Sequence, residues 1–151
     1  MKTLQTGDDE KSDFVKITRK INFFASMNMG LLEKILTYVT LYEYGAGEKV
    51  CRQGEKGDAF YAVKAGRLTV SVKKGLIFSK KLAELGPGDF FGEMALIDRA
   101  PRNATIACET AAKLFVLLSE HFEAAMRENP KLAEEMKSLA AARRFELIHN
   151  T

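Results

Sequence analysis

The sequence is poor in the residues on which most enzymes and disulfide-stapled domains depend. It has two cysteines and two histidines among 151 residues. Cys51 and Cys108 form no C-x-x-C pair and have no histidine nearby, so we expect buried free thiols and a cytoplasmic location rather than a disulfide framework. His121 and His149 are the whole supply of side chains that titrate near neutral pH and of the commonest metal ligand. This shortage argues against most metal-dependent and acid–base enzymes, and we expect neither a metal nor a cofactor.

A strong charge excess and a long apolar run are also missing. The 23 Lys and Arg residues exceed the 20 Asp and Glu residues by three, too few to indicate a nucleic acid or an anionic membrane as partner. The densest basic group is Lys73, Lys74, Lys80 and Lys81, which is typical of a solvated hairpin. No stretch approaches the roughly 18 apolar residues of a transmembrane helix, and acidic residues stand where a signal peptide would be apolar.

What remains is the composition of one globular domain. Hydrophobic residues make up 46% of the chain, and a chain of this length buries roughly 68 to 70% of its surface on folding, which is enough for a core without staples. Residues 1–12 are polar and without period, so they predict a flexible leader. The single domain is expected to span residues 13–149.

Helical periodicity is present at both ends of this domain. A first helix is expected over residues 13–24, capped by Asp13, because Phe14, Ile17, Ile21 and Phe24 recur at helical spacing. A second should follow, capped by Ser26 or Asn28. Near the C-terminus, Ser119 can cap one helix and Pro130 suits the first turn of another that reaches about residue 149. The last helix is amphipathic and needs a partner surface.

Between residues 41 and 118, short segments rich in Val, Phe, Tyr and Thr alternate with glycine-bearing turns. Strands are expected at residues 41–44, 49–52, 59–64, 67–73, 76–85, 105–108 and 112–118. The regular turns favour an antiparallel β-roll or jelly-roll barrel. The fold class is therefore mainly β with flanking helices, an α+β arrangement.

One segment, residues 86–106, interrupts the strands with helix-forming residues. Gly92 lets the backbone approach a ligand closely, and residues 93–97 can form a short helix whose free amides favour an anion. Arg102 can return to the same point, and its guanidinium matches two phosphate oxygens. Glu93 accepts hydrogen bonds at neutral pH, most simply from a sugar hydroxyl. A phosphate beside a hydroxyl suggests a ribose phosphate.

This segment resembles the phosphate-binding cassette of cyclic nucleotide-binding domains, F-G-E-x-A-L followed by P-R-x-A-T. Its fixed positions are matched by Phe91, Gly92, Glu93, Ala95, Leu96, Pro101, Arg102, Ala104 and Thr105. Residues 52–67 look like the family's R-x-G-x-x-G-D segment, and residues 85–90 look like its L-x-x-G-D turn. The spacing from Glu93 to Arg102 is similar to that of kinase regulatory subunits and nucleotide-gated channels, and one residue shorter than in the catabolite activator. The resemblance covers roughly residues 20–145.

The resemblance implies a role for each matched position. Glu93 would bind the ribose 2′-hydroxyl and Arg102 the cyclic phosphate, with backbone amides at Ala95 and Asn103. The phosphate and ribose site is expected to comprise Gly92, Glu93, Met94, Ala95, Arg102, Asn103, Ala104 and Thr105. The base would lie against Val70, Leu82 and Leu85. Leu139 and Phe145, on the last helix, could form a lid.

Asn103 departs from the commonest pattern, which has Ala after the arginine in domains that favour cAMP and Thr or Ser in those that accept cGMP. An asparagine amide can both donate and accept hydrogen bonds. The preference between cAMP and cGMP therefore stays open at this point.

The resemblance implies a regulatory module that binds cAMP or cGMP reversibly and signals by moving its C-terminal helices toward an unknown protein effector. The alternative is a β-roll that lost or changed its ligand and acts as an interaction module. A cupin-like metal enzyme or a phosphodiesterase is disfavoured because no histidine falls on an expected strand. The last helix could fold back as a lid or pair with a second copy in a homodimer. We expect a stand-alone sensor, with no helix-turn-helix to contact DNA.

Overall fold

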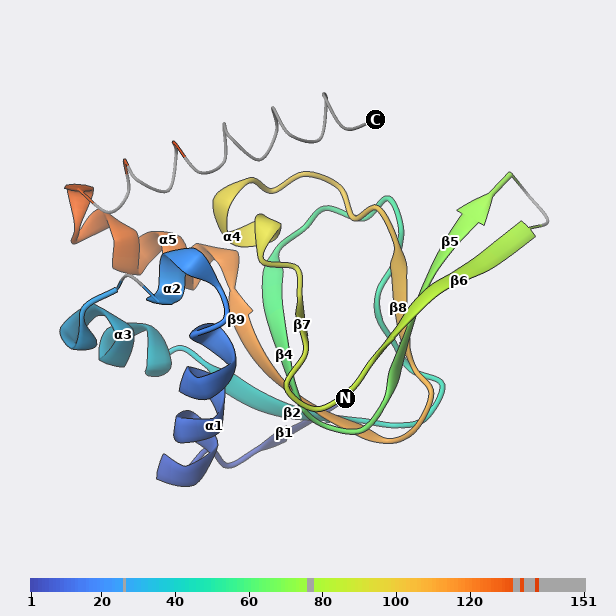
Figure 1. The fold of residues 1–151 in the computed structure, drawn as a ribbon, viewed down its shortest axis with the longest axis horizontal. Helices are drawn as coiled ribbons and strands as arrows, with labels where there is room; N and C mark the ends of the chain where they lie inside the picture. The colour runs from blue at the N-terminus through green and yellow to red at the C-terminus, as the bar shows by residue number, and fades with distance from the viewer. Residues whose placement is uncertain (26, 76–77, 132–133, 135–137, 139–151) are drawn as a thin grey trace.

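The computed structural model describes residues 1–25, 27–75, 78–131, 134 and 138. Its strands form two antiparallel sheets that face each other across the interior of a roll (Figure 1). One sheet has the order β1 (Lys2–Leu4), β2 (Thr40–Tyr44), β9 (Ala112–Leu118), β4 (Ala59–Ala65) and β7 (Phe90–Phe91). The other has the order β3 (Lys49–Cys51), β8 (Thr105–Cys108), β5 (Leu68–Lys74) and β6 (Phe78–Leu85). The expected β-roll with flanking helices is confirmed, as two open sheets rather than a closed barrel.

The helices gather on the outer side of the five-stranded sheet (Figure 1). They are α1 (Asp8–Thr18), α2 (Asn22–Ala25), α3 (Met29–Leu36) and α5 (Ser119–Arg127), while the short α4 (Met94–Ile97) lies over the mouth of the roll. Of the two caps considered for the helix after residue 28, the structure uses Asn28, whose side chain accepts a hydrogen bond from the Leu31 amide at 2.9 Å.

Strands β4 and β9 are buried on both faces because they lie between two cores. Phe60 and Phe115 point into the core beneath the helices, whereas Tyr61 and Leu114 point into the roll. Successive side chains of a strand face opposite sides, so a strand covered on both sides reads as an almost continuous apolar run. This double burial makes the five-stranded sheet the shared wall between the helices and the roll.

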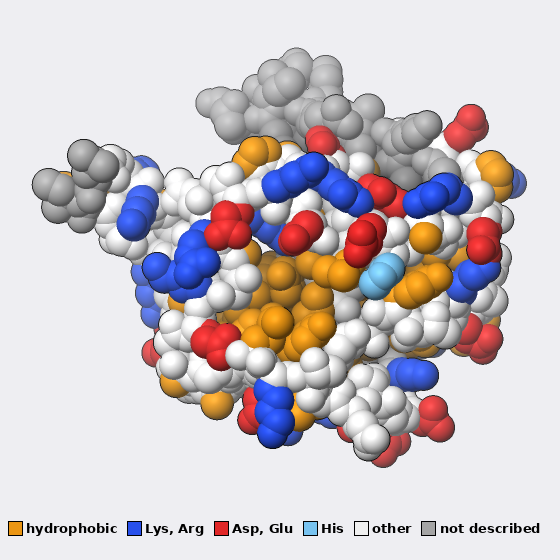
Figure 2. All heavy atoms as spheres, turned by 180° about the vertical axis from the view of Figure 1, so that it is seen from behind, with side chains coloured by type: hydrophobic (Ala, Val, Ile, Leu, Met, Phe, Trp, Pro, Cys, Tyr) orange, Lys and Arg blue, Asp and Glu red, His pale blue; other side chains and the backbone are white. Residues whose placement is uncertain are grey.

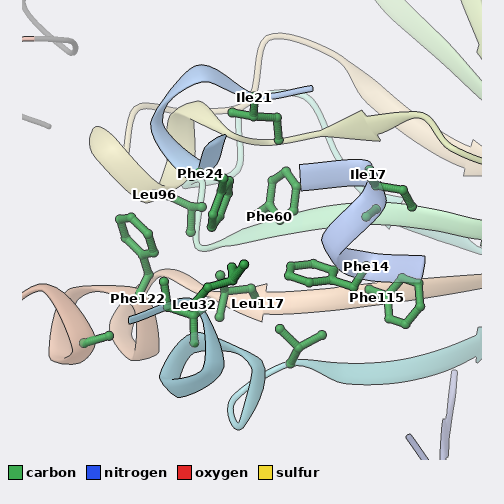
Figure 3. Packing of buried hydrophobic residues seen from close by; sticks show 14 of the residues in the cluster. Phe14, Ile17, Ile21, Phe24, Leu32, Phe60, Leu96, Phe115, Leu117 and Phe122 are labelled. Atoms are coloured by element: carbon green, nitrogen blue, oxygen red, sulfur yellow. The ribbon is translucent and has the colours of Figure 1, made fainter. Parts of the chain in front are cut away.

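The core beneath the helices is rich in phenylalanine. The rings of Phe14, Phe24, Phe60 and Phe115 have centroid separations of 5.6 to 6.5 Å, mostly edge to face (Figure 3). Leu96 of α4 belongs to the same cluster and is only 4% exposed. The short helix at the mouth of the roll is thus anchored in the helical core.

The N-terminal predictions were wrong in two respects. Residues 1–12 were expected to form a flexible leader, but Lys2–Leu4 pairs with β2 as an edge strand and α1 already begins at Asp8. The N-cap of α1 is Gly7 rather than Asp13. A short polar strand has no apolar pattern by which its sequence could predict it. It forms here because its backbone pairs with β2.

The single helix expected over residues 13–24 is instead two helices, separated by a turn at residues 19–21. The amides of Lys20 and Ile21 donate to the carbonyls of Ile17 and Thr18, which tightens the chain at the end of α1. Ile21 and Phe24 are nevertheless buried in the expected core. The apolar spacing therefore predicted the burial correctly while missing the change of direction.

Candidate functional site

A pocket of about 460 Å³ lies between α4, the segment after it and the inner face of the roll. This volume is within the range of roughly 300 to 1,000 Å³ that small-molecule sites occupy. It is lined by Cys51, Val70, Leu85, Phe91, Gly92, Glu93, Met94, Ala95, Asp98, Ala100, Pro101, Arg102, Asn103, Ala104 and Ile106. Figure 2 shows a hollow with hydrophobic side chains on its floor and charged side chains around its rim on one face of the molecule. Most of the predicted cassette residues are therefore brought to one cavity.

Arg102 is held at the pocket by the strand behind it. Its Nη2 donates to the carbonyl oxygen of Ala59 at 2.6 Å, and its guanidinium lies 5.8 Å from the centroid of the Tyr61 ring. Both partners are neutral at pH 7: a backbone carbonyl carries no charge, and burial raises the pKa of Tyr61 further from neutrality, to about 12. Among the described residues, no carboxylate forms an ion pair with Arg102. The pocket thus contains a half-buried cation whose charge is not neutralised by these neighbours.

Gly92 makes room for this arginine. Its backbone has φ +79°, and a Cβ built on it would lie 2.5 Å from Arg102 Nη1 and 2.7 Å from the Ala59 carbonyl oxygen. Both the left-handed conformation and the close approach require glycine. Gly92 and Arg102, ten residues apart in the sequence, are thus fitted against each other.

The segment after α4 is held by the loop between β3 and β4. The amide of Gly54 donates to the Arg102 carbonyl and the amide of Arg102 donates to the Glu55 carbonyl, both at 2.7 Å. The amide of Gly57 donates to the Ala100 carbonyl at 3.1 Å, and a Cβ at Gly57 would lie 2.9 Å from that oxygen. The glycine-containing loop and the arginine segment are therefore one backbone-bonded unit.

The other residues predicted for the anion site line the pocket, with the exception of Thr105. Glu93 is half-buried at the N-terminus of α4 and lines the pocket beside Met94, Ala95, Asn103 and Ala104. The amide of Ala95 donates to the Gly92 carbonyl at 3.0 Å, so it already has an acceptor within the segment. Thr105 does not line the pocket, and its Oγ1 instead accepts a hydrogen bond from the Gln53 amide at 3.0 Å.

One of the three residues predicted to form the apolar wall does not line the pocket. Val70 and Leu85 line the pocket as expected, whereas Leu82 is 53% exposed and does not. The register between β5 and β6 shifts between Val70 and Ser71, so that Ala83 and Lys81 face these residues and Leu82 falls outside the regular pairing. Simple alternation along β6 could not reveal this bulge.

Three wall residues escaped the sequence-based prediction: Cys51, Phe91 and Ile106. Each lies on an inward-facing strand position, the signal that could have marked it. Burial raises the pKa of the Cys51 thiol, so it remains a neutral part of the wall at pH 7. Strand β7, which contributes Phe91, was also missed because it is two residues long. The suggested lid residues Leu139 and Phe145 lie outside the described residues.

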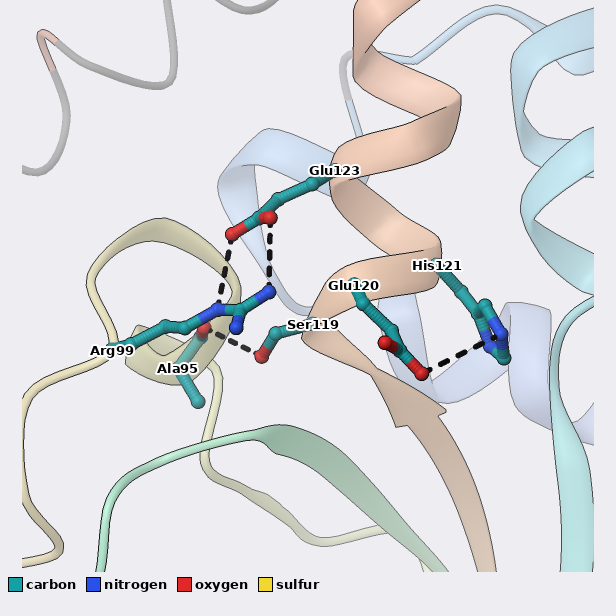
Figure 4. A network of polar contacts seen from close by, with 6 residues as sticks. All are labelled: Ala95, Arg99, Ser119, Glu120, His121 and Glu123. Carbon is teal, nitrogen blue, oxygen red and sulfur yellow. Dashed lines mark hydrogen bonds and ion pairs between the residues drawn. The ribbon is translucent and has the colours of Figure 1, made fainter.

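Two contacts join the pocket to α5. The hydroxyl of Ser119, the first residue of α5, is fully buried and donates to the Ala95 carbonyl at 2.7 Å (Figure 4). Arg99 donates from Nε and Nη2 to the two carboxylate oxygens of Glu123 at 3.1 and 2.9 Å. Ser119 therefore does not cap α5 as predicted but ties this helix to α4.

The part of the chain that contains this pocket is similar in sequence to a known protein family. A family model described as "Cyclic nucleotide-binding domain" matches residues 41–129, which is more than half of the 151-residue chain. The chain belongs to the cyclic nucleotide-binding domain family. The match includes both sheets apart from β1, the pocket and α5, and the family is a regulatory, ligand-binding domain.

Relatives of this cyclic nucleotide-binding domain occur in several kinds of protein. A cyclic nucleotide-gated potassium channel of Mesorhizobium japonicum is 33% identical over 137 residues, which cover 89% of this chain and 37% of the channel. The cyclic AMP receptor protein of Thermus thermophilus is 32% identical over 108 residues, 72% of this chain and 50% of that protein. The regulatory domain of Toxoplasma gondii PKA, solved with cAMP, has a TM-score of 0.70 and 29% identity over 80% of this chain and 46% of that chain. The chain thus spans half the length of these relatives or less.

Two further features bear on partners and cofactors. None of the helices in the described part of the chain has the length and apolar character needed to cross a bilayer. No group of three or more His, Cys, Asp or Glu side chains in that part is placed to hold a metal ion.

Proposed function

We propose that this domain binds a cyclic nucleotide, cAMP or cGMP, reversibly in the pocket and catalyses no reaction on it. The observation that carries the proposal is the half-buried Arg102, whose guanidinium reaches the pocket without a carboxylate partner among the described residues. A planar guanidinium can donate to two oxygens of one phosphate. A cyclic phosphate brings one negative charge, which one arginine can neutralise.

The surroundings of Arg102 support a small anion rather than a highly charged one. Tyr61 and Cys51 stay uncharged at neutral pH because burial raises the pKa of each, so neither repels a phosphate. Two carboxylates, Glu93 and Asp98, also line the pocket. A triphosphate would meet these carboxylates with Arg102 as the one arginine among the described residues that line the pocket.

The ribose and base have plausible partners in the same cavity. We assign Glu93 to the ribose 2′-hydroxyl, since its carboxylate can only accept hydrogen bonds at pH 7. Val70, Leu85 and Ile106 supply an apolar wall suited to the base. Asn103 also lines the pocket, and its amide could serve either a guanine amino group or a phosphate oxygen, so the preference between cAMP and cGMP is left to titration.

Signalling would pass through the contacts between the pocket and α5. Leu96 packs in the helical core, and the Ser119 hydroxyl and the Arg99–Glu123 pair join α5 to the cassette. A nucleotide that shifts α4 must therefore also bias α5 and the chain beyond it toward one arrangement. An unidentified protein effector would read this change, in the reducing cytoplasm where Cys51 and Cys108 remain free thiols.

The alternative of a domain that has lost its ligand is not favoured. A domain that binds no anion has no electrostatic use for an arginine that lacks a carboxylate partner among the described residues, or for the glycine fitted to it, in a pocket. Here Arg102, Gly92 and Glu93 are all present and all line the same cavity.

Calorimetric titration with cAMP and cGMP in parallel tests the proposal. We expect saturable binding with one site per chain. The control ligand is 5′-AMP, which carries a second phosphate charge and lacks the cyclic phosphodiester. Absence of heat and of thermal stabilisation with either cyclic nucleotide would overturn it. Sedimentation with and without the bound nucleotide would test the predicted homodimer through the last helix, most of which lies outside the described residues.

Replacing Glu93 with glutamine is expected to separate the contribution of the ribose to the binding affinity from that of the phosphate. The amide keeps the shape of the side chain but weakens a charge-assisted hydrogen bond to the 2′-hydroxyl, worth about 1.5 to 3 kcal/mol. Binding of cAMP or cGMP should fall accordingly, whereas binding of the 2′-deoxy analogues should change little. Equal losses for both ligands, measured by calorimetry, would show that Glu93 does not hold the ribose.

A further inference from the structure

The hairpin of β5 and β6 projects from the roll, away from the helices (Figure 1). Strand β6 lies at the edge of its sheet and pairs with β5 alone. Seven of its eight residues are exposed, among them Phe78 at 75% and Leu82 at 53%. Phe78 is therefore a large apolar side chain left in water near the end of a projecting hairpin.

Lysines surround this phenylalanine on both faces of the hairpin. Lys74 lies directly opposite Phe78, and Lys80 lies two residues further on the same face. Lys73 lies on the other face, opposite Ser79. All three are exposed, and in the described part of the chain none of their ammonium groups pairs with a carboxylate. Lys81 is the exception, since it pairs with Glu84.

The sequence of the hairpin adds to this pattern. Residues 67–83 contain five Lys and Arg residues and no Asp or Glu. The net charge of +3 for the whole chain therefore conceals one strongly basic segment with an apolar residue at its centre.

We propose that this hairpin docks on an anionic lipid surface, with Phe78 entering the boundary between headgroups and acyl chains and Lys73, Lys74 and Lys80 contacting the headgroups. Lysines near an apolar side chain are complementary to such a surface, because its headgroups are anionic and the acyl chains beneath them are apolar. A nucleic acid would satisfy the lysines but offers no apolar phase to an exposed phenylalanine. The proposal differs from the expectation that no membrane takes part, which rested on net charge and on the lack of a spanning helix, and it is independent of nucleotide binding.

Flotation with vesicles tests the docking. The full chain should bind vesicles of phosphatidylcholine containing phosphatidylserine at low salt, much less at high salt, and little to pure phosphatidylcholine. Each lysine near the surface contributes about fivefold to binding, so the triple variant K73Q/K74Q/K80Q should lose about 100-fold. Phe78→Ser should lose about tenfold or more, including at a salt concentration that leaves measurable binding.

A matched control carries the same change in charge at exposed lysines off the hairpin, K49Q/K113Q/K131Q. It should lose no more than a few-fold, and circular dichroism with thermal unfolding should show all variants folded. The proposal is overturned if the wild-type chain does not float with anionic vesicles. It is also overturned if the control triple loses as much as the hairpin triple, if Phe78→Ser floats like the wild type, or if the chain binds a single-stranded oligonucleotide and not the vesicles.

Discussion

Arg102→Ala is expected to weaken the binding of cAMP and cGMP by about 2 to 5 kcal/mol, or roughly 30- to 4,000-fold. The variant removes the cation that reaches the pocket beside Gly92, and a phosphate bound there would be partly desolvated without a charged partner. Calorimetry of the wild type and the variant, with the same ligand and salt, measures the loss.

Arg52→Ala is the matched control for charge. Arg52 lies on the same glycine-containing loop that holds the Arg102 segment, but its side chain is 64% exposed and pairs with Glu55 at 3.6 Å. Its loss should change the affinity by less than about threefold, since exposed ion pairs contribute little. Arg102→Lys keeps the charge without the two-pronged geometry and should lie between the wild type and alanine. Unchanged affinity in Arg102→Ala, or equal losses in Arg102→Ala and Arg52→Ala, would contradict the site.

Gly92→Ala is expected to lower the free energy of unfolding by about 2 to 5 kcal/mol and to weaken nucleotide binding as well. About 1 to 2 kcal/mol comes from placing a Cβ at φ +79°. A further 1 to 3 kcal/mol, roughly, comes from crowding against Arg102 and the Ala59 carbonyl. Relief of that crowding must displace the guanidinium from its bond to Ala59, so chemical denaturation and calorimetry should both register the change.

Gly47→Ala separates the two causes. Gly47 has φ +87°, but a Cβ there would have no atom within 4 Å, so its variant should lose only the backbone part, about 1 to 2 kcal/mol, and no affinity. If Gly92→Ala behaves like Gly47→Ala in both measurements, then the close fit between Gly92 and Arg102 has no part in binding.

Structural features that depend on a sequence pattern within one helix or strand were predicted well. Strands such as β8 and β9 match their expected limits at residues 105–108 and 112–118, because composition and turn glycines act locally. The burial of Phe14, Ile17, Ile21 and Phe24 was also correct. The failures lie where such a pattern is not enough. The strand β1 and the bulge that exposes Leu82 depend on pairing with another strand, and the turn after α1 is a change of direction that apolar spacing does not encode.

The candidate site divides in the same way. The identities of Gly92, Glu93 and Arg102, and the order of the glycine motifs around them, were sufficient to indicate a cyclic nucleotide-binding cassette. Cys51, Phe91 and Ile106 could not be assigned to its wall, because they come from three different strands that the two sheets bring together. The Ser119 hydroxyl likewise looked like a helix cap and proved to bind the Ala95 carbonyl.

The sequence by itself determined the class of fold and the family, and it indicated the residues that we propose contact a phosphate and a ribose, since each depends on residue types at short, fixed spacing. The tertiary structure alone decided that Arg102 is fitted against Gly92, that α5 is tied to the cassette through Ser119 and Glu123, and that Phe78 stands exposed among lysines on a projecting hairpin. Each is a contact between different elements of the fold or the exposure of a side chain on one of them. They follow from how the two sheets and the helices pack, which no local pattern records.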